Sequence, residues 1–273
     1  MKTSLLITTF NRSPLLEKSL ERLTHLTLPD EVLVVDDGSI DATEQVCKGF
    51  KERLPIRYIY NHNPKHSICS FARNIGVKNT DCEIIITAEP ELLFVTDIVS
   101  QMLKKRKEFP NHIISVGTVY HAQEYAYIRD KAYIDPMGFL KDEIVENYII
   151  EPRPYDTHGF VKTVNMQATF CALYEKSWIE AVGGWDEGFK GSWGWDDVDI
   201  CTRLRIKGYN QVISKEMECI HQWHPHLLPH LMGEASKLNE DYLISKKLNE
   251  VIDKNDERLI ANKSMDWGII IKK

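Results

Sequence analysis

The chain has 273 residues, of which 43% are hydrophobic and 27% are charged. This balance is typical of an ordinary globular protein with one large or two closely fused domains, and it excludes a disordered chain or a fibrous repeat. The 34 basic and 40 acidic residues give a net charge of -6, so the chain as a whole has no general attraction to nucleic acid or anionic lipid.

The apolar run at the amino terminus, in MKTSLLITTFNR, is too short for a signal peptide or a membrane span and predicts a first buried strand. The six cysteines form no CxxC pair, so we expect reduced, buried thiols and neither a zinc module nor a disulfide framework. These features predict a cytoplasmic protein without a transmembrane segment, and they leave a membrane-associated pathway open.

Short apolar runs alternate with amphipathic stretches through the first half of the chain, which predicts βαβ units around a mostly parallel sheet. The expected strands are Ser4–Thr9, Glu31–Val35, Ile56–Tyr60, Glu83–Thr87 and His112–Val116. The expected helices lie near Pro14–Leu26, Thr43–Leu54, Phe71–Val77 and Asp97–Glu108. Asp41 and Glu44 predict a capping box at the start of the second helix.

The pattern loosens between about residues 120 and 162, where we expect irregular segments and short helices over one edge of the sheet. After this stretch we expect a strand in VNMQATFCALY, a helix from about Lys176 to Val182 and a helix from near Asp197 to Gly208. The polar segment from about Leu228 to Asn262 predicts helix on the outside, and WGIIIKK predicts an edge strand.

Two carboxylates, Asp36 and Asp37, directly follow an apolar strand in VLVVDDGSID. Ligands of open α/β sheets bind at the carboxyl ends of the strands, where these side chains could accept hydrogen bonds from a base imide or from ribose hydroxyls. A plain turn with capping polar groups explains the same residues equally well. TTFNR, from Thr8 to Arg12, follows the first strand and places polar and basic groups at the same edge.

FARNIGVKN places Arg73 near a helix start, where it could pair with a diphosphate or be an ordinary surface arginine. EIIITAEPELLF runs from an apolar strand into Glu89 and Glu91. Carboxylates at i and i+2 share one side of an extended chain, so this pair could share a divalent cation that bridges donor phosphates. The alternative is a solvated acidic turn in which Pro90 ends the strand.

The segment GGWDEGFKGSWGWDDVDICTRL combines glycines, acidic residues and three tryptophans, Trp185, Trp193 and Trp195. Aromatic faces suit the apolar C–H surfaces of sugars, and a carboxylate at a helix start can accept a hydroxyl proton. The acidic residues also favour the helix amino terminus through its dipole, and two of them, Asp186 and Asp199, fit a purely structural role.

CIHQWHPH carries three histidines within six positions, His221, His224 and His226. Neutral imidazoles are common metal ligands, and an i, i+3 pair supplies two nitrogens from one short segment, although a single histidine is more often a satisfied polar residue. Together with Glu91, His221 and His224 would form a mixed oxygen and nitrogen site suited to manganese.

In chain order, TTFNR, VVDDGSID, ARNIG, the acidic pair, GGWDE, WGWDDVD and HQWH resemble the motifs of the A-type glycosyltransferases. The resemblance is to the large family-2 group and to the galactosyltransferase-like carboxyl-terminal region of β-1,4-galactosyltransferases and chondroitin polymerases. It covers roughly residues 3–226 and implies an α/β fold of GT-A type, a nucleotide-binding, mostly parallel sheet flanked by helices with an acceptor-side subregion. It divides the chain into a nucleotide-sugar-binding half (1–118), an acceptor-binding and catalytic half of the same domain (119–226) and a helical extension (227–273).

The resemblance also implies roles for individual residues. The residues implied to hold the nucleotide sugar are Thr8, Phe10, Arg12, Asp36, Asp37, Arg73 and Glu89. Those implied to hold the metal are Glu91, His221 and His224. Asp197 matches the catalytic base, and Asp196, its partner in the catalytic pair, contacts the acceptor beside Trp193 and Trp195. Glu89-Pro90-Glu91 departs from the family's Asp-x-Asp, which leaves the identity and affinity of the metal open.

The implied reaction is a direct displacement with inversion, dependent on Mn²⁺ or Mg²⁺, from a nucleotide-diphosphate sugar, UDP-sugar favoured, to an acceptor hydroxyl on a glycan. Transfer to a modified nucleic-acid base, a non-catalytic carbohydrate-binding protein with a degenerate transferase fold, and a nucleotidyltransferase are alternatives. The chain contains neither GxGxxG nor GxxxxGK[ST], which disfavours a dehydrogenase or an ordinary kinase. The donor sugar, the acceptor and the oligomeric state are not specified by these residues.

Overall fold

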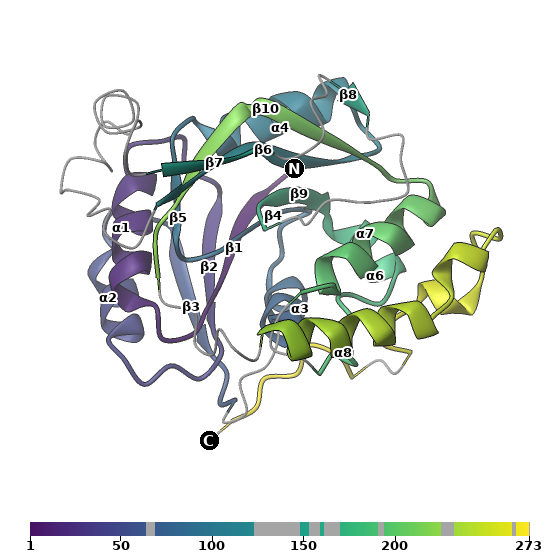
Figure 1. Ribbon diagram of the computed structural model, residues 1–273. Coiled ribbons are helices and arrows are strands. Elements are labelled where there is room, and N and C mark those ends of the chain that lie inside the picture. Colours follow the sequence, from purple (N-terminus) through teal and green to yellow (C-terminus); the bar gives the residue numbers. More distant parts are fainter. Residues whose placement is uncertain are drawn as a thin grey trace.

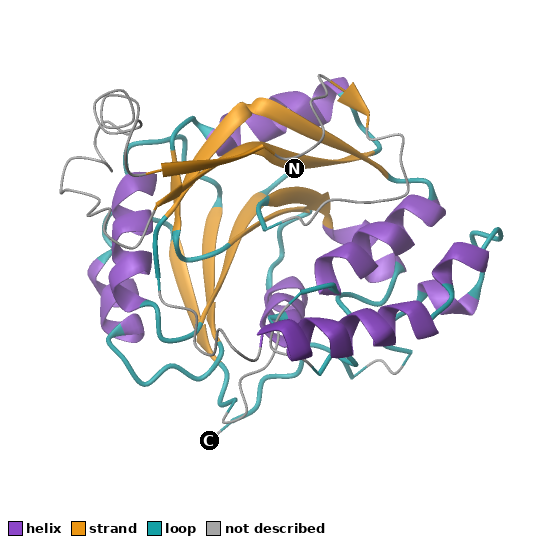
Figure 2. Cartoon of the chain, in the orientation of Figure 1, coloured by secondary structure: helices purple, strands orange, loops and turns teal. Residues whose placement is uncertain are grey.

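The computed structural model describes residues 1–63, 69–122, 148–152, 159–160, 170–190, 194–224, 232–263 and 266–272. One curled sheet runs through the described part of the chain, with helices on both of its faces (Figures 1 and 2). The strand order is β3-β2-β1-β4-β9-β6-β10-β5, with β7 paired to β6 and β8 paired to β10.

The first half of the sheet is parallel and consists of β1 (Thr3–Thr9), β2 (Glu31–Asp36), β3 (Ile56–Tyr60) and β4 (Ile84–Ala88). Every residue of β1 and β4 is buried, as expected for central strands that are covered on both faces. Because the carboxyl ends of these strands point the same way, the polar segments that follow them gather at one edge of the sheet.

The second half of the sheet introduces antiparallel pairing. β9 (Ala172–Glu175) lies antiparallel between β4 and β6 (His112–Ala122), and β10 (Asn210–His221) runs parallel to β6. β5 (Leu92–Phe94) pairs antiparallel with the end of β10. β7 (Tyr148–Pro152) and β8 (Gly159–Phe160) add antiparallel pairs to β6 and β10.

Alternate side chains of the central strands pack into two hydrophobic cores, one on each face of the sheet. Leu5 and Val34 belong to a core with α1 (Ser13–Leu23), α2 (Thr43–Gly49) and α4 (Ile98–Glu108). Leu6 and Leu33 belong to a second core with α3 (Ser70–Asn79), α6 (Lys176–Ala181) and α7 (Asp196–Lys207). α8 (Met232–Ser245) lies outside α7, and the short helices η2 (Leu248–Glu250) and η3 (Glu257–Leu259) follow it.

The predicted α/β fold with helices flanking the sheet is confirmed, and all five strands predicted in the first half are present. The fourth begins at Ile84, and the fifth continues to Ala122 because β10 and β7 pair with its second half. The strands β5, β7, β8 and β10 were not anticipated, and β7 and β8 lie where irregular segments and short helices were expected. β5 has only three residues, too few to produce a periodic pattern.

Three local predictions were wrong. The second helix ends at Gly49 and not near Leu54, since glycine is a poor helix former and Pro55 constrains the residue before it. Asp41 forms no capping box: its carboxylate accepts the Ser13 N–H at 2.9 Å and the Thr43 N–H at 3.1 Å, so it holds the starts of α1 and α2 together. WGIIIKK is not a strand among its described residues, 267–272.

All six cysteines are free thiols; five of them are buried, as predicted, and Cys69 is half-buried. Within the residues that the structure describes, no helix combines the length and the apolar character needed to cross a bilayer.

Candidate functional site

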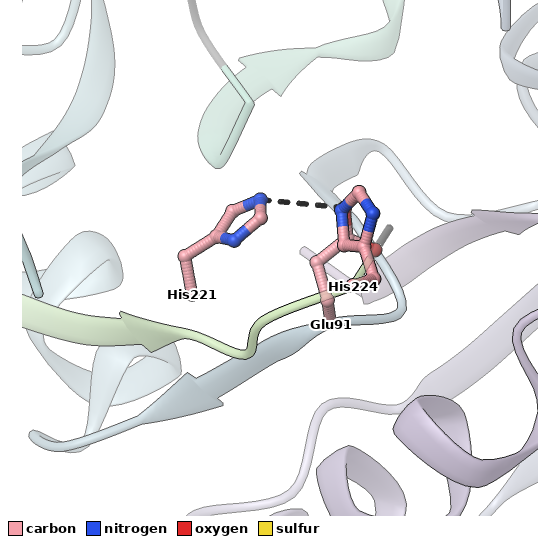
Figure 3. A group of neighbouring side chains, drawn as sticks. All are labelled: Glu91, His221 and His224. Atoms are coloured by element: carbon pink, nitrogen blue, oxygen red, sulfur yellow. Dashed lines mark ion pairs between the residues drawn. The ribbon is translucent and has the colours of Figure 1, made fainter. Parts of the chain in front are cut away.

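The predicted metal ligands lie together although about 130 positions separate them in the chain. The pairing of β5 with β10 places Leu92 opposite His221, and the Gln222 N–H then donates to the Glu91 carbonyl oxygen at 3.0 Å. Glu91 Oε1 lies 3.5 Å from His221 Nε2 and 3.4 Å from His224 Nε2 (Figure 3). One ligand atom from each residue lies within 4.8 Å of the other two, so the group has the size and donor chemistry of a cation site.

Helix α1 anchors both segments that carry this cluster. The Ser19 hydroxyl donates to the Pro90 carbonyl oxygen at 2.7 Å. The Gln222 side-chain amide donates to the Leu15 carbonyl oxygen at 3.1 Å and to Ser19 Oγ at 3.2 Å. Gln222 is almost fully buried, so the segment between the two histidines is tied to the same helix as the Glu89-Pro90-Glu91 connection.

The two glutamates of this connection have different partners. Burial would raise the pKa of Glu91, but hydrogen bonds and charges from His221 and His224 outweigh it and hold that pKa well below its usual range. Burial, with the negative charge of Glu91, raises the pKa of Glu89 to about 8. Glu89 Oε1 instead lies 3.5 Å from Arg73 Nη2. The two carboxylates are therefore directed to different cationic groups in this structure.

Arg73 joins this cluster to the start of α7. Its Nη1 donates to Asp196 Oδ2 at 2.8 Å, and its guanidinium lies 5.7 Å from the centre of the Trp185 ring. Burial raises the pKa of Asp196 to about 6, although the positive charge of Arg73 opposes this shift. The Ser70 hydroxyl, at 3.3 Å, donates to the same carboxylate oxygen. Asp196 therefore lies inside the protein against Arg73, in the first turn of α7.

Asp197, the predicted catalytic base, is the next residue of that turn and is only half-buried. Its Oδ1 accepts the Val198 N–H at 2.9 Å. The turn begins after Trp195, which has the left-handed φ of 76°. Helix α8 supports this conformation, because Trp195 Nε1 donates to Ser236 Oγ at 3.0 Å and Asn239 Nδ2 donates to the Gly194 carbonyl oxygen at 3.1 Å.

Five of the seven residues predicted to hold the nucleotide sugar lie at or just after the carboxyl ends of β1 and β2, and the other two, Arg73 and Glu89, lie in α3 and directly after β4. Thr8 is a buried residue of β1, and Phe10 and Arg12 lie half-buried in the loop after it. Arg12 Nη2 lies 3.2 Å from His224 Nδ1, so this loop meets the cluster of Glu91, His221 and His224.

Asp36 and Asp37 are almost fully buried and have separate polar contacts. Asp36 accepts the Tyr58 hydroxyl at 2.5 Å and the Ser39 N–H at 2.7 Å, which is the turn-stabilising role that the sequence left open. Asp37 accepts amide hydrogens of Asn61 at 2.8 Å and Asn63 at 2.9 Å.

Two groups of residues in and around this site were missed from the sequence. Asn61 and Asn63 follow β3 in YNHN, and the rule that drew attention to Asp37, polar residues directly after a strand, applies to them too. Lys246 pairs with Asp186 at 2.7 Å and with Asp199, contacts between separate segments that no local pattern predicts. Trp193 and His226, both singled out from the sequence, lie outside the described residues.

Comparison with known proteins assigns the chain to a family. Residues 4–183 match the family model described as glycosyl transferase family 2. The chain belongs to glycosyl transferase family 2. This family-2 chain is 24% identical to chondroitin synthase of Pasteurella multocida over 230 residues, 75% of this chain and 23% of that protein. It is 25% identical to validoxylamine A glucosyltransferase of Streptomyces hygroscopicus subsp. jinggangensis over 264 residues, 89% of this chain and 60% of that protein. The chain thus spans less than two thirds of the length of either relative.

Solved structures share the fold of this family-2 chain. Staphylococcus aureus TarS 1–349 in complex with UDP matches with a TM-score of 0.58 and 14% identity, over 82% of this chain and 61% of that one. The mannosyltransferase PcManGT from Pyrobaculum calidifontis, in complex with GDP-Man and Mn²⁺, matches with a TM-score of 0.54 and 18% identity, over 80% and 56%. The expected GT-A fold is confirmed.

Proposed function

We propose that this family-2 chain is a metal-dependent, inverting glycosyltransferase that moves a sugar from a nucleoside-diphosphate sugar to a hydroxyl of a glycan. The observation that carries the proposal is the convergence of Glu91, His221 and His224 at the sheet edge where the predicted nucleotide-binding loops meet. The relative named chondroitin synthase supports a glycan acceptor, and the fold neighbours in complex with UDP or with GDP-Man and Mn²⁺ support the donor class.

The donor atoms of the cluster fit a divalent cation. One carboxylate and two imidazoles are ligands that Mn²⁺ accepts, and the buried Glu91 carboxylate would lose much of its desolvation cost beside a cation. Mn²⁺ or Mg²⁺ is the proposed ion. A bound cation would supply positive charge for the departing diphosphate.

We propose that other side chains at this edge of the sheet bind different parts of the donor. Asp37, close to the end of β2, is placed for the base or ribose, and UDP is the favoured nucleotide. Arg12 and Arg73 supply positive charge from the β1–α1 loop and from α3, on the side of the site where Glu91 lies. Arg73 also links the donor side to the acceptor side, because its guanidinium contacts both Glu89 and Asp196.

Asp197 is the proposed general base. It would take the proton from the acceptor hydroxyl as the hydroxyl oxygen bonds to the anomeric carbon and the bond to the diphosphate breaks. This attack from the opposite side inverts the configuration. Asp196, held by Arg73, fixes the helix turn from which the base projects, and Trp195 offers an aromatic face to the acceptor sugar. General-base assistance of this kind contributes about 10²- to 10⁴-fold in rate.

The proposal is tested with a panel of nucleotide sugars in the presence of Mn²⁺, scored by thermal shift and by release of the nucleoside diphosphate. We expect one uridine-diphosphate sugar to raise the melting temperature and to release UDP faster when a glycan acceptor is added. The proposal is refuted if the chain binds a sugar acceptor but none of the nucleotide sugars raises its melting temperature.

A further inference from the structure

Residues 266–272, which we call the terminal segment, run from helix α3 to the loop after β3. In Figure 1 this segment reaches the region where the first parallel strands end. Its contacts fall into two groups. The first half is anchored against the body of the protein, and the second half forms hydrogen bonds beside Asp37.

The anchor of the terminal segment is Trp267. This side chain is 6% exposed and belongs to the core beneath α3 and α7. Lys78 Nζ lies 3.9 Å from the centre of its ring. The Gly268 N–H donates to Glu187 Oε1 at 2.9 Å, and Gly268 has φ +71° with the Asn74 carbonyl oxygen only 2.7 Å from where a Cβ would lie. The path of the segment after Trp267 is therefore set by close backbone packing.

In the second half of the segment, the backbone N–H and carbonyl of Ile271 each form a hydrogen bond. The Ile271 N–H donates to Asn61 Oδ1 at 2.7 Å, and the Ile271 carbonyl accepts the His62 N–H at 2.8 Å. Asn61 is 1% exposed, and its Nδ2 donates to Asp37 Oδ1 at 2.8 Å. An asparagine amide has one oxygen acceptor and one nitrogen donor group, so a single orientation serves both partners. The Ile271 N–H selects that orientation.

The amides of Asn61 and Asn63 approach different oxygens of the Asp37 carboxylate. Because each oxygen accepts one of the two amides, these contacts fix the orientation of the carboxylate. We infer that Ile271, acting through the Asn61 amide, positions Asp37 for the donor nucleotide. This inference rests on the proposed function, and it makes Asn61 and Ile271 positioning residues for donor affinity.

The test compares two substitutions at one position. Ile271→Pro removes the N–H that Asn61 accepts, whereas Ile271→Ala keeps both backbone groups and removes only the side chain. Binding of UDP with saturating Mn²⁺ is measured by calorimetry. We expect Ile271→Pro to weaken UDP binding about tenfold, as for the loss of one hydrogen bond, and Ile271→Ala to stay within about twofold of the unaltered chain.

Steady-state kinetics separates positioning from a general loss of structure. We expect Ile271→Pro to raise the KM for the donor by a similar factor and to leave kcat at saturating donor within about twofold, because the segment holds Asp37 and not the Asp197 base. A second pair guards against misfolding by proline: a chain that stops after Ile270 lacks the N–H, and a chain that stops after Ile271 retains it. We expect only the shorter chain to bind UDP about tenfold more weakly.

Equal UDP affinity within both pairs overturns the inference. Equal weakening by Ile271→Pro and Ile271→Ala also overturns it, since the side chain and not the N–H would then be responsible. If the unaltered chain binds UDP tightly and every variant does too, the proposed function stands and only the positioning role fails. If the unaltered chain does not bind UDP with Mn²⁺, the uridine-nucleotide donor is refuted and this inference with it.

Discussion

Replacing Lys246 by methionine removes a buried positive charge that joins three segments of the protein. Lys246 Nζ lies 2.7 Å from Asp186 Oδ2 and also pairs with Asp199, and its side chain is 12% exposed. Removing one partner of a buried ion pair costs about 3–5 kcal/mol when the other charge is left uncompensated. Here Asp199 keeps Arg203 at 2.6 Å, and Asp186 keeps the Tyr242 hydroxyl at 3.1 Å. We therefore expect the lower end of that range, a loss of about 3 kcal/mol in the free energy of unfolding.

Urea denaturation followed by tryptophan fluorescence measures this loss, and the neighbouring lysine provides the control. Lys247 is 66% exposed and lies 3.9 Å from Glu250, so Lys247→Met should change the free energy of unfolding by less than about 0.5 kcal/mol. Because Asp199 lies in the first turn of α7, we also expect Lys246→Met to lower turnover by loosening the turn that carries Asp197. Equal stability of the two variants would refute the reasoning.

Three further predictions follow from the site and its supports. Glu91→Gln keeps the shape of the side chain but removes its charge, so we expect Mn²⁺ to bind at least about tenfold more weakly. Electron paramagnetic resonance of the free ion measures this affinity, and an unchanged affinity would show that Glu91 is not a metal ligand. Asp197→Asn should lower turnover about 10²- to 10⁴-fold with UDP affinity retained, and loss of UDP binding in a folded variant would reassign the residue to structure. Burial alone would raise the pKa of Asp186, but the charge of Lys246 and its hydrogen bond lower this pKa below its ordinary value of 3.8. The ionised carboxylate therefore stabilises the fold above pH 3.8, and this stabilisation is lost as the pH falls through the pKa of the folded state. Urea titrations across that range should show a smaller acid loss in Lys246→Met, and equal losses would contradict the assignment.

The candidate metal site shows how much of a site local patterns can predict. HQWH and the acidic pair identify His221, His224 and Glu91 as candidate ligands by residue type, since imidazole and carboxylate groups are common metal ligands. Their meeting depends on β5 and β10, which were both missed. The same limit explains the glutamates: alternation in an extended chain suggests one shared face, but tertiary contacts direct Glu89 to Arg73 and Glu91 to the histidines.

The sequence by itself determined the parallel half of the sheet and the edge at which polar residues gather. Those features follow from nearest-neighbour chemistry, apolar runs that must be buried on both faces and polar residues that must lie where each run ends. Only the tertiary structure decided which carboxylates face inward. Asp36, Asp37 and Asp196 each belong to an Asp-Asp pair, yet their partners Tyr58, Asn61 and Arg73 come from other segments of the chain. A hydrogen bond or ion pair across the fold depends on the packing of whole elements, which no short stretch of residues encodes.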